Sequence, residues 1–318
     1  MVGNSQRLSL RAFRVSRPIL IAGPTAVGKS AVALALAEQL DGEIVSVDSM
    51  QVYRGLDIGT AKPSADERQR VAHHLIDVVE MRERFDAGRF ARLSREACAD
   101  IARRGRVPIL CGGTGLYFKA FLEGLGESPP ADPILRAELQ ARPLPELLDE
   151  LERRDPDTFS RIDRANPRRV IRAVEVVRLT GRPFSSQRAA WTGQPGTDLF
   201  FGLARLGPDL GARIDRRVEE MFARGLVQET ERLLEAGLAE SHTAMQAIGY
   251  RQVVEHLQGE RSLRETIGLV KRRTRQFAKR QLTWFRRQFS PLWLNLDPEA
   301  RPGPVADQLA GRCEKVLL

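Results

Sequence analysis

The stretch that decides the fold reads AGPTAVGKSAVALALAEQL, residues 22–40. Its first half fits the pattern G-x-x-x-x-G-K-[ST], placed between the apolar run 18–22 and a helix-like segment. In that context the loop amides and the positive helix end hold a phosphate chain. The positions expected to hold it are Gly23, Pro24, Thr25, Ala26, Val27, Gly28, Lys29 and Ser30. The pattern does not distinguish nucleoside phosphates from other diphosphates.

Two side chains of this loop have separate expected roles. Lys29 adds a positive charge beside the phosphates, and the hydroxyl of Ser30 can bind Mg²⁺. We therefore expect Mg²⁺ as the cofactor, with Ser30 as its protein ligand.

Three apolar segments, 19–22, 43–47 and 107–111, end in short polar or glycine-rich turns. Their apolar residues run on without alternation, which is typical of buried parallel strands. In open α/β sheets, ligands bind outside the carboxyl ends of such strands. We therefore expect the phosphate loop, Asp48 and Thr114 to share one crevice.

The rest of the chain completes an α/β protein in which a P-loop-type parallel sheet is flanked by helices. Strand patterns return at 198–203 and 292–296, and helical patterns lie at 209–224, 227–236 and 262–289. Between about 125 and 196 the sequence is rich in Arg and Leu at helical spacing and lacks strand signals. We expect a core of 18–124 plus 197–318, interrupted by a helical insertion domain, 125–196.

Composition narrows the class of protein. The 318 residues are 42% hydrophobic and 29% charged, as in ordinary globular proteins. No apolar run approaches the roughly 18 residues of a membrane span. Cys98, Cys111 and Cys313 are far apart, which favours a reducing compartment, the cytoplasm, and no zinc site. The adjacent His73 and His74 lack a third metal ligand at a matching spacing.

Asp48 allows two chemical readings. At the end of an apolar strand it is placed like the aspartate that serves Mg²⁺ in ATPases. The competing reading makes it a general base or hydrogen-bond acceptor for the nucleophile. A third, structural reading has the aspartate cap a turn.

The net charge of +9 is concentrated in two places. Segment 271–287 holds eight basic residues and no acid, and at 100° per residue Val270, Phe277, Trp284 and Phe285 form one stripe expected to pack inward. The insertion adds Arg161, Arg164, Arg168, Arg169 and Arg172. Uncompensated like charges favour a polyanion, and two basic regions favour a nucleic acid.

Longer motifs give a specific resemblance. They are GPTAVGKS (23–30), SVDSMQVYRGLDIGTAKP (46–63), HHLID (73–77), GGTGLYFK (112–119), QAIGYR (246–251) and TRQFAKRQLTWFR (274–286). In this order they closely resemble the bacterial tRNA dimethylallyltransferases, over nearly the whole of residues 18–287. The resemblance implies a Mg²⁺-dependent transfer of a dimethylallyl group from its diphosphate to N6 of adenine 37 in tRNAs reading codons that begin with U.

The same resemblance assigns roles to individual positions. Asp48 and Thr114 are implied to be catalytic, with Asp48 receiving the adenine amine, and the insertion domain is implied to contact tRNA. The implied tRNA-binding positions are Asp48, Ser49, Met50, Gln51, Arg168, Arg169, Val170, Ile171, Arg172, Gln246, Ala247, Ile248, Gly249, Tyr250, Arg251, Lys279, Arg280, Gln281, Leu282, Thr283, Trp284, Phe285 and Arg286.

Two segments depart from the family's pattern. Residues 166–175 read NPRRVIRAVE where the family usually has Asn-Asp and then Gln-Arg before Arg-Ala-Leu-Glu-Val. Residues 206–210 read LGPDL and lack a usual arginine, which leaves Arg213 and Arg217 as candidates to hold the diphosphate.

Three functions are weighed. The first is the tRNA prenyltransferase, acting as a monomer on dimethylallyl diphosphate and the anticodon stem-loop of tRNA, without a membrane. The second is a P-loop kinase of a nucleoside or small metabolite, with Asp48 as base and the insertion as a lid. The third is a nucleic-acid-stimulated NTPase.

Overall fold

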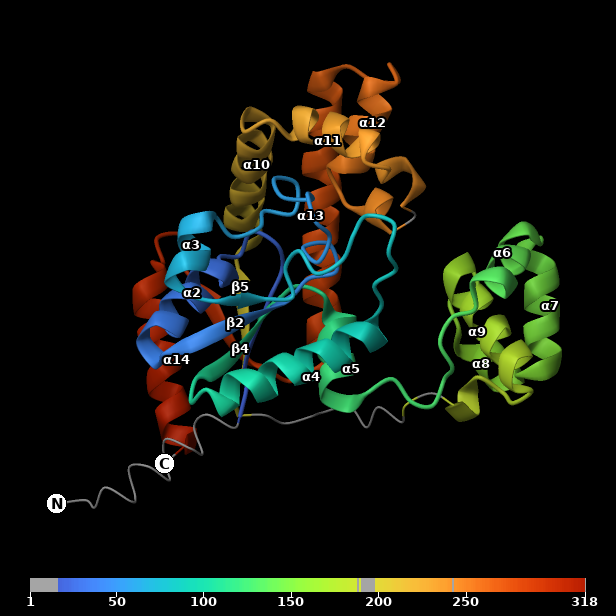
Figure 1. The fold of residues 1–318 in the computed structure, drawn as a ribbon, viewed down its shortest axis with the longest axis horizontal. Coiled ribbons are helices and arrows are strands. Elements are labelled where there is room, and N and C mark those ends of the chain that lie inside the picture. The colour runs from blue at the N-terminus through green and yellow to red at the C-terminus, as the bar shows by residue number, and fades with distance from the viewer. Residues whose placement is uncertain (1–16, 188, 190–197, 242, 318) are drawn as a thin grey trace. The chain divides into compact units, whose positions relative to one another are not determined.

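The computed structural model describes residues 17–187, 189, 198–241 and 243–317. These residues divide into two compact units, one within Glu123–Thr192 and the other within Met1–Leu122 and Gly193–Leu318 (Figure 1). The division expected from the sequence has its boundaries at 125 and 196, and position 196 lies outside the described residues. Each unit is described by itself below.

A six-stranded sheet forms the centre of the larger unit, and its strand order is β3-β2-β4-β1-β5-β6. Every neighbouring pair is parallel. The strands are β1 (Ile19–Ala22), β2 (Gly42–Val47), β3 (His73–His74), β4 (Val107–Gly112), β5 (Phe200–Arg205) and β6 (Leu292–Leu296). All residues of β1, β2 and β4 are buried, which confirms the reading of their uninterrupted apolar runs.

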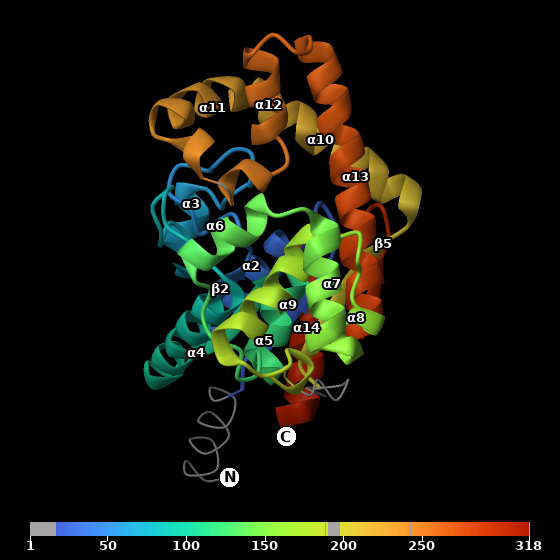
Figure 2. The ribbon, with the colours of Figure 1, turned by 90° about the vertical axis from the view of Figure 1, so that its right-hand side faces the viewer.

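Nine described helices belong to this unit. They are α2 (Lys29–Leu40), α3 (Ala65–Arg70), α4 (Ala87–Arg103), α5 (Gly115–Glu123), α10 (Gly207–Ala223), α11 (Leu226–Glu235), α12 (Tyr250–Leu257), α13 (Leu263–Gln288) and α14 (Pro302–Leu317). Helices α10, α11, α12 and the first half of α13 extend beyond the end of the sheet at which β1 and β2 finish (Figures 1 and 2). These helices therefore stand over the expected ligand crevice.

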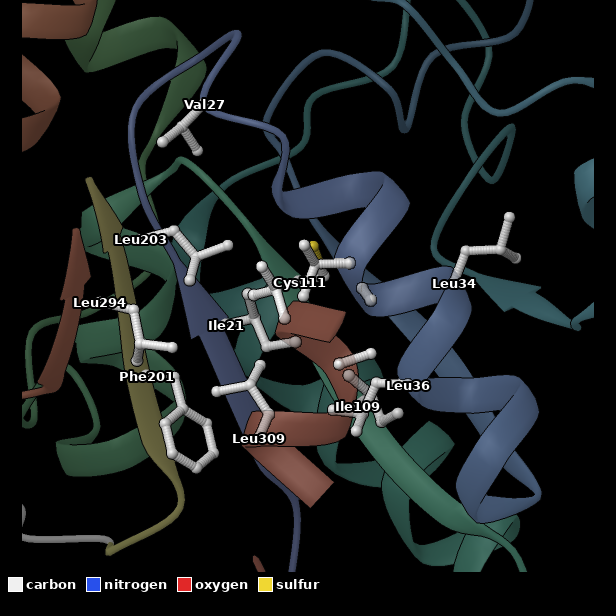
Figure 3. Packing of buried hydrophobic residues seen from close by; sticks show 14 of the residues in the cluster. Ile21, Val27, Leu34, Leu36, Ile109, Cys111, Phe201, Leu203, Leu294 and Leu309 are labelled. Carbon is white, nitrogen blue, oxygen red and sulfur yellow. The ribbon is translucent and has the colours of Figure 1, made fainter. Parts of the chain in front are cut away.

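Each face of the sheet is covered by helices, so the fold is the expected parallel α/β class. Ile21, Ile109 and Phe201 point from the strands toward Leu36 of α2 and Leu309 of α14 (Figure 3). On the opposite face, the Phe118 ring of α5 stacks on Phe200 at a centroid distance of 5.5 Å. The alternation of Phe200 and Phe201 between the two faces follows from the period of two in a strand.

The smaller unit is helical, as its lack of strand signals predicts. Its helices are α6 (Pro133–Ala141), α7 (Leu144–Arg154), α8 (Pro156–Arg161) and α9 (Pro167–Thr180). Its core consists of Leu139, Leu147, Leu151, Val170, Ile171, Ala173 and Val174. Leu147 and Leu151 recur four residues apart on α7, the spacing that places side chains on one helix face.

Two further expectations concern the whole chain. Among the described residues, no helix combines the length and the apolar character needed to cross a bilayer. The three cysteines are free thiols and all are buried.

Candidate active site

The phosphate loop connects β1 to α2 and takes its shape from two residues with left-handed backbone. Ala26 has φ 64° and Gly28 has φ 106°, and successive turns of this kind point amide groups into a concave anion site. Gly23 is also required, because a Cβ there would lie 2.7 Å from the carbonyl oxygen of Leu203 in β5. The loop therefore needs its first and second glycines for different reasons: close approach at Gly23 and backbone conformation at Gly28.

Three carbonyl groups of the loop are each bonded to a cationic side chain. Lys29 Nζ donates to Pro24 O at 3.2 Å, and Arg213 Nε donates to Ala26 O at 2.9 Å. Arg205 Nε donates to Val27 O at 2.9 Å. Because their lone pairs face cations, these carbonyls repel an incoming anion less. Sequence reasoning missed Arg205, although an arginine that ends the otherwise apolar strand FFGLAR was a visible signal.

The amides of the loop divide into used and free groups. Thr25 N donates to Gln281 Oε1 at 2.8 Å, and Val27 N donates to Pro24 O at 3.4 Å. These two predicted phosphate ligands are therefore occupied within the protein. The N–H groups of Gly28, Lys29 and Ser30 have no hydrogen bond to any residue that the structure describes. They begin α2, where the helix dipole favours an anion.

Asp48 follows β2 and opens a tight turn beside the loop. Its Oδ1 accepts hydrogen bonds from Met50 N at 2.8 Å and from Gln51 N at 3.3 Å. The second oxygen, Oδ2, has no hydrogen bond within the described part of the chain. The Thr114 hydroxyl accepts from Ser49 N at 3.2 Å, which joins the end of β4 to this turn. The expected convergence of Asp48 and Thr114 at the sheet end is observed.

Cationic side chains lie near Asp48. Burial lowers the pKa of Lys29, Arg217 lowers it further, and the negative charge of Asp48 opposes that shift. Burial also lowers the pKa of Arg217, and Asp48 again opposes the shift. Arg217 makes no hydrogen bond to a described residue, unlike Arg213, which is tied to the loop. Of the two arginines predicted to meet a diphosphate, Arg217 is thus the one whose guanidinium donors are not engaged.

The site as a whole combines an Asp48 oxygen that has no hydrogen bond to a described residue with the nearby cations Lys29 and Arg217. No group of three or more His, Cys, Asp or Glu side chains is placed to hold a metal ion in the described ranges. The arrangement can bind an anion through the start of α2 and can take a proton at Asp48. It therefore fits the transfer of a group from a phosphate ester to a nucleophile that gives up a proton as it reacts.

Residues 51–288 match the family described as IPP transferase. The chain belongs to this family. The tRNA dimethylallyltransferase 1 of Trichlorobacter lovleyi is 49% identical over 284 residues, covering 87% of this chain and 93% of the relative. The tRNA dimethylallyltransferase of Geobacter metallireducens is 47% identical over 285 residues, covering 88% and 92%.

Solved structures of IPP transferases have the same fold. The full-length tRNA isopentenylpyrophosphate transferase of Bacillus halodurans has a TM-score of 0.67 at 38% identity, covering 95% of this chain and 98% of that one. A eukaryotic dimethylallyltransferase described as acting on tRNA has a TM-score of 0.70 at 29% identity, covering 87% and 73%.

In this IPP transferase, several residues predicted to touch tRNA lie inside the protein. Those with buried side chains are Val170, Ile171, Ala247, Tyr250, Gln281 and Phe285. For these six, the structure does not support a direct side-chain contact with RNA. Tyr250 instead donates from its hydroxyl to Glu229 Oε1 at 2.6 Å and accepts from Gly59 N at 3.0 Å. It thereby anchors the loop that follows Asp48.

Gln51 has a similar internal role in the family member. Its side chain accepts from Ser46 Oγ at 2.8 Å and donates to the carbonyls of Thr60 at 3.1 Å and Ala61 at 3.2 Å. The turn after Asp48 is therefore held from two directions. A contact of Gln51 with RNA stays a prediction.

The outer face of α13 remains strongly basic. Lys271 pairs with Glu219 and Arg275 with Asp215, each at 2.5 Å. Within residues 271–287, the exposed cations without an ion pair to a described residue are Arg272, Arg273, Lys279, Arg280, Arg286 and Arg287. Phe277 was expected to pack inward and is 37% exposed. The buried row runs instead through Thr266, Val270, Ala278, Gln281 and Phe285.

The insertion unit has fewer available cations than its sequence suggests. Arg172 is bonded to Glu175 Oε2 at 2.7 Å and to Pro129 O at 2.5 Å, and Arg161 pairs with Asp157. Arg169 is exposed and has no ion pair among the described residues. The predicted basic face of this unit is therefore partly neutralised by the unit's own acids.

Proposed function

We propose that this chain transfers a dimethylallyl group from dimethylallyl diphosphate to N6 of adenine 37 in the anticodon loop of tRNAs that read codons beginning with U. The products are N6-dimethylallyladenosine and diphosphate. The observation that carries the proposal is the free Oδ2 of Asp48 beside Lys29 and Arg217, in a chain whose relatives are named tRNA dimethylallyltransferases.

The residues fit both halves of this reaction. As the bond from N6 to the allylic carbon forms, the carbon–oxygen bond to the diphosphate breaks and the N6 proton moves to Asp48. The adenine amine is a weak nucleophile, so a positioned base raises the rate of the reaction by about 10²–10⁴-fold. Lys29, Arg217 and the amides at the start of α2 stabilise the charge that gathers on the departing diphosphate.

The site offers one side-chain oxygen, the hydroxyl of Ser30, as a ligand for Mg²⁺. Ser30 is exposed in the first turn of α2, and its hydroxyl makes no hydrogen bond to a described residue. Mg²⁺ takes few protein ligands and prefers oxygen atoms together with substrate phosphates. When bound, the ion would neutralise charge on the diphosphate. We expect Ser30 to hold it, and we expect a monomer to be sufficient for activity.

A flipped adenine in a single-stranded loop suits this site. Extruding a base costs a few kcal/mol and costs least where the base is already unpaired. The six cations of segment 271–287 without an ion pair to a described residue support binding of the RNA backbone, and Arg169 supports a contact from the insertion unit. The cytoplasm, where unmodified tRNA is found, is the expected location.

The kinase and NTPase alternatives are not favoured by the relatives' names. The experiment that separates them incubates the protein with Mg²⁺, dimethylallyl diphosphate and an unmodified tRNA transcript, and in parallel with γ-labelled ATP and nucleosides. We expect N6-dimethylallyladenosine at position 37 after nuclease digestion and mass spectrometry. Label transfer from ATP without any modified adenosine would reject the proposal.

A further inference from the structure

Helix α13 lies along the two loops of the site and contacts them in succession. Gln281 bonds both loops, and one helical turn later Trp284 covers Gly115 at the start of α5. A further turn on, the carbonyl of Gln288 accepts from Lys119 Nζ of α5 at 3.4 Å. The spacing 281, 284, 288 places these residues on one helix face. That inner face is distinct from the exposed basic face of the same helix.

Gln281 is the polar residue at the centre of this contact. Its Oε1 accepts from Thr25 N of the phosphate loop at 2.8 Å, and its Nε2 donates to Gly113 O of the loop after β4 at 2.9 Å. The residue is 8% exposed. A Cβ on Gly113 would lie 2.2 Å from Nε2, so the glycine permits this close approach. Both ends of the amide are thus engaged by backbone groups from different loops.

The two bonded loops hold opposite halves of the site. Thr25 belongs to the anion cradle that begins at Gly23. Gly113 precedes Thr114, whose hydroxyl accepts from the backbone of Ser49 in the turn that Asp48 opens. A single side chain therefore links the backbone of the cradle to the backbone that carries the carboxylate. This link adds to that of the sheet, in which Gly112 at the end of β4 pairs with Ala22 of β1 and with Val47 of β2.

We propose that Gln281 is a positioning residue for the transfer reaction. It holds the diphosphate loop and the Asp48–Thr114 pair at the separation at which the allylic carbon and the adenine nitrogen can meet. The inference rests on the proposed function. It differs from the resemblance-based role of Gln281 as a tRNA contact, because the amide is occupied inside the protein.

The amide needs both a donor and an acceptor, which makes two substitutions informative. Gln281→Leu removes both bonds and leaves Thr25 N and Gly113 O without partners. Gln281→Glu keeps the acceptor for Thr25 N, but an ionised carboxylate faces the Gly113 carbonyl and repels it. When that carboxylate is protonated, its O–H can donate to Gly113 O in place of the amide. Gln308→Glu, on an exposed position of α14 away from the site and from the basic face of α13, is the control.

The experiment measures kcat and KM for both substrates, tRNA affinity by filter binding, and thermal unfolding, with the full-length chain. We expect Gln281→Leu to lower kcat at least tenfold while the tRNA Kd stays within twofold. Gln281→Glu should lose activity at pH 8 and regain part of it, relative to wild type, as the pH falls. A merely structural role would not give this pH-dependent rescue. Gln308→Glu should change kcat by less than twofold at either pH.

The outcomes separate the two proposals. If wild type forms no modified adenosine, the proposed function fails, and this inference fails with it. If wild type is active and both Gln281 variants fold and keep kcat within twofold, only the positioning role is overturned. A tRNA Kd raised more than tenfold at unchanged kcat would overturn the positioning role and show that Gln281 contributes to RNA binding. If Gln281→Leu does not fold, the pH response of Gln281→Glu alone decides.

Discussion

The Trp284 indole of α13 occupies the space that a Cβ atom on Gly115 would need, at 2.1 Å from Cε3 of the ring. Trp284 also packs edge-on against Phe285 and Phe289, with centroid distances of 5.8 and 5.5 Å. The ring therefore has little room to withdraw. Gly115 directly follows Thr114, so this contact fixes the loop on which the threonine stands.

Gly115→Ala should displace that loop. We expect the free energy of unfolding to fall by about 1–3 kcal/mol, the usual range for an overpacked site, and kcat to fall with it. Chemical unfolding and steady-state kinetics are the measurements. Gly311→Ala is the control, because nothing lies within 4 Å of its added Cβ and alanine favours the helix α14 by up to about 1 kcal/mol. Equal effects of the two substitutions would argue against the packing explanation.

Asp48→Asn tests the base directly. Asparagine keeps an oxygen that can accept from Met50 N and Gln51 N, so the turn should survive. Loss of the proton acceptor should lower kcat by about 10²–10⁴-fold, while the Kd values for tRNA and diphosphate change little. Single-turnover kinetics and equilibrium binding measure the two effects. An active variant would remove Asp48 from the chemistry.

The basic face of α13 should act through phosphate contacts. Replacing Lys279 and Arg280 together with alanine should weaken tRNA binding by about tenfold and lower the slope of log K against log salt by about 1.4, or ~0.7 for each single-strand phosphate. Filter binding between ~50 and ~200 mM salt measures both. The double variant of Lys271 and Arg275, whose charges are already paired with acids, should have a smaller effect. If the two pairs behave alike, the unpaired cations have no special role.

Diphosphate binding should depend on pH through Lys29. Burial holds its pKa below the ordinary lysine value of 10.5, and an anion beside it favours the charged form. Affinity should therefore be high below the lowered pKa and fall as the pH rises through it. Binding in that range should take up a proton at Lys29, which calorimetry in buffers of different ionisation heat detects. Lys29→Arg should abolish this contribution, and equal proton uptake by both proteins would exclude Lys29 as its source.

Tyr250→Phe should lower the stability of the protein without changing its affinity for tRNA. The substitution leaves Gly59 N without its partner and removes the donor to Glu229, at a cost of about 1–3 kcal/mol in unfolding free energy. The tRNA Kd should stay within twofold because the ring is fully buried. Denaturant titration and filter binding measure these quantities. A loss of tRNA affinity at unchanged stability would contradict the anchoring role.

The elements of the fold that the sequence predicts are those whose signals are local. Continuous apolar runs and the glycine pattern suffice for β1, β2, β4 and the phosphate loop, because their signals are local. The helix α14 was not predicted, yet Val305, Leu309 and Cys313 recur four residues apart and are buried on it. This spacing of apolar residues is typical of an amphipathic helix, so the sequence contained the signal for α14.

Gln281 and Tyr250, two positions that the resemblance assigns to a tRNA contact, are buried for one physical reason. Both side chains carry polar groups, whose burial is costly unless they are hydrogen-bonded. Their partners, Gly113 and Gly59, lie 168 and 191 positions away in the chain. Burial of a polar side chain depends on such distant backbone groups. No periodicity or motif within either segment contains that information.

The three cation-bonded carbonyls of the phosphate loop have one more consequence. Lys29, Arg205 and Arg213 hold Pro24, Val27 and Ala26 in place before any substrate arrives. The conformational entropy of the loop is therefore lost when the chain folds, and not when it captures its ligand. Association with a diphosphate can then proceed at a rate governed by encounter and desolvation, without a slow rearrangement of the backbone that receives it.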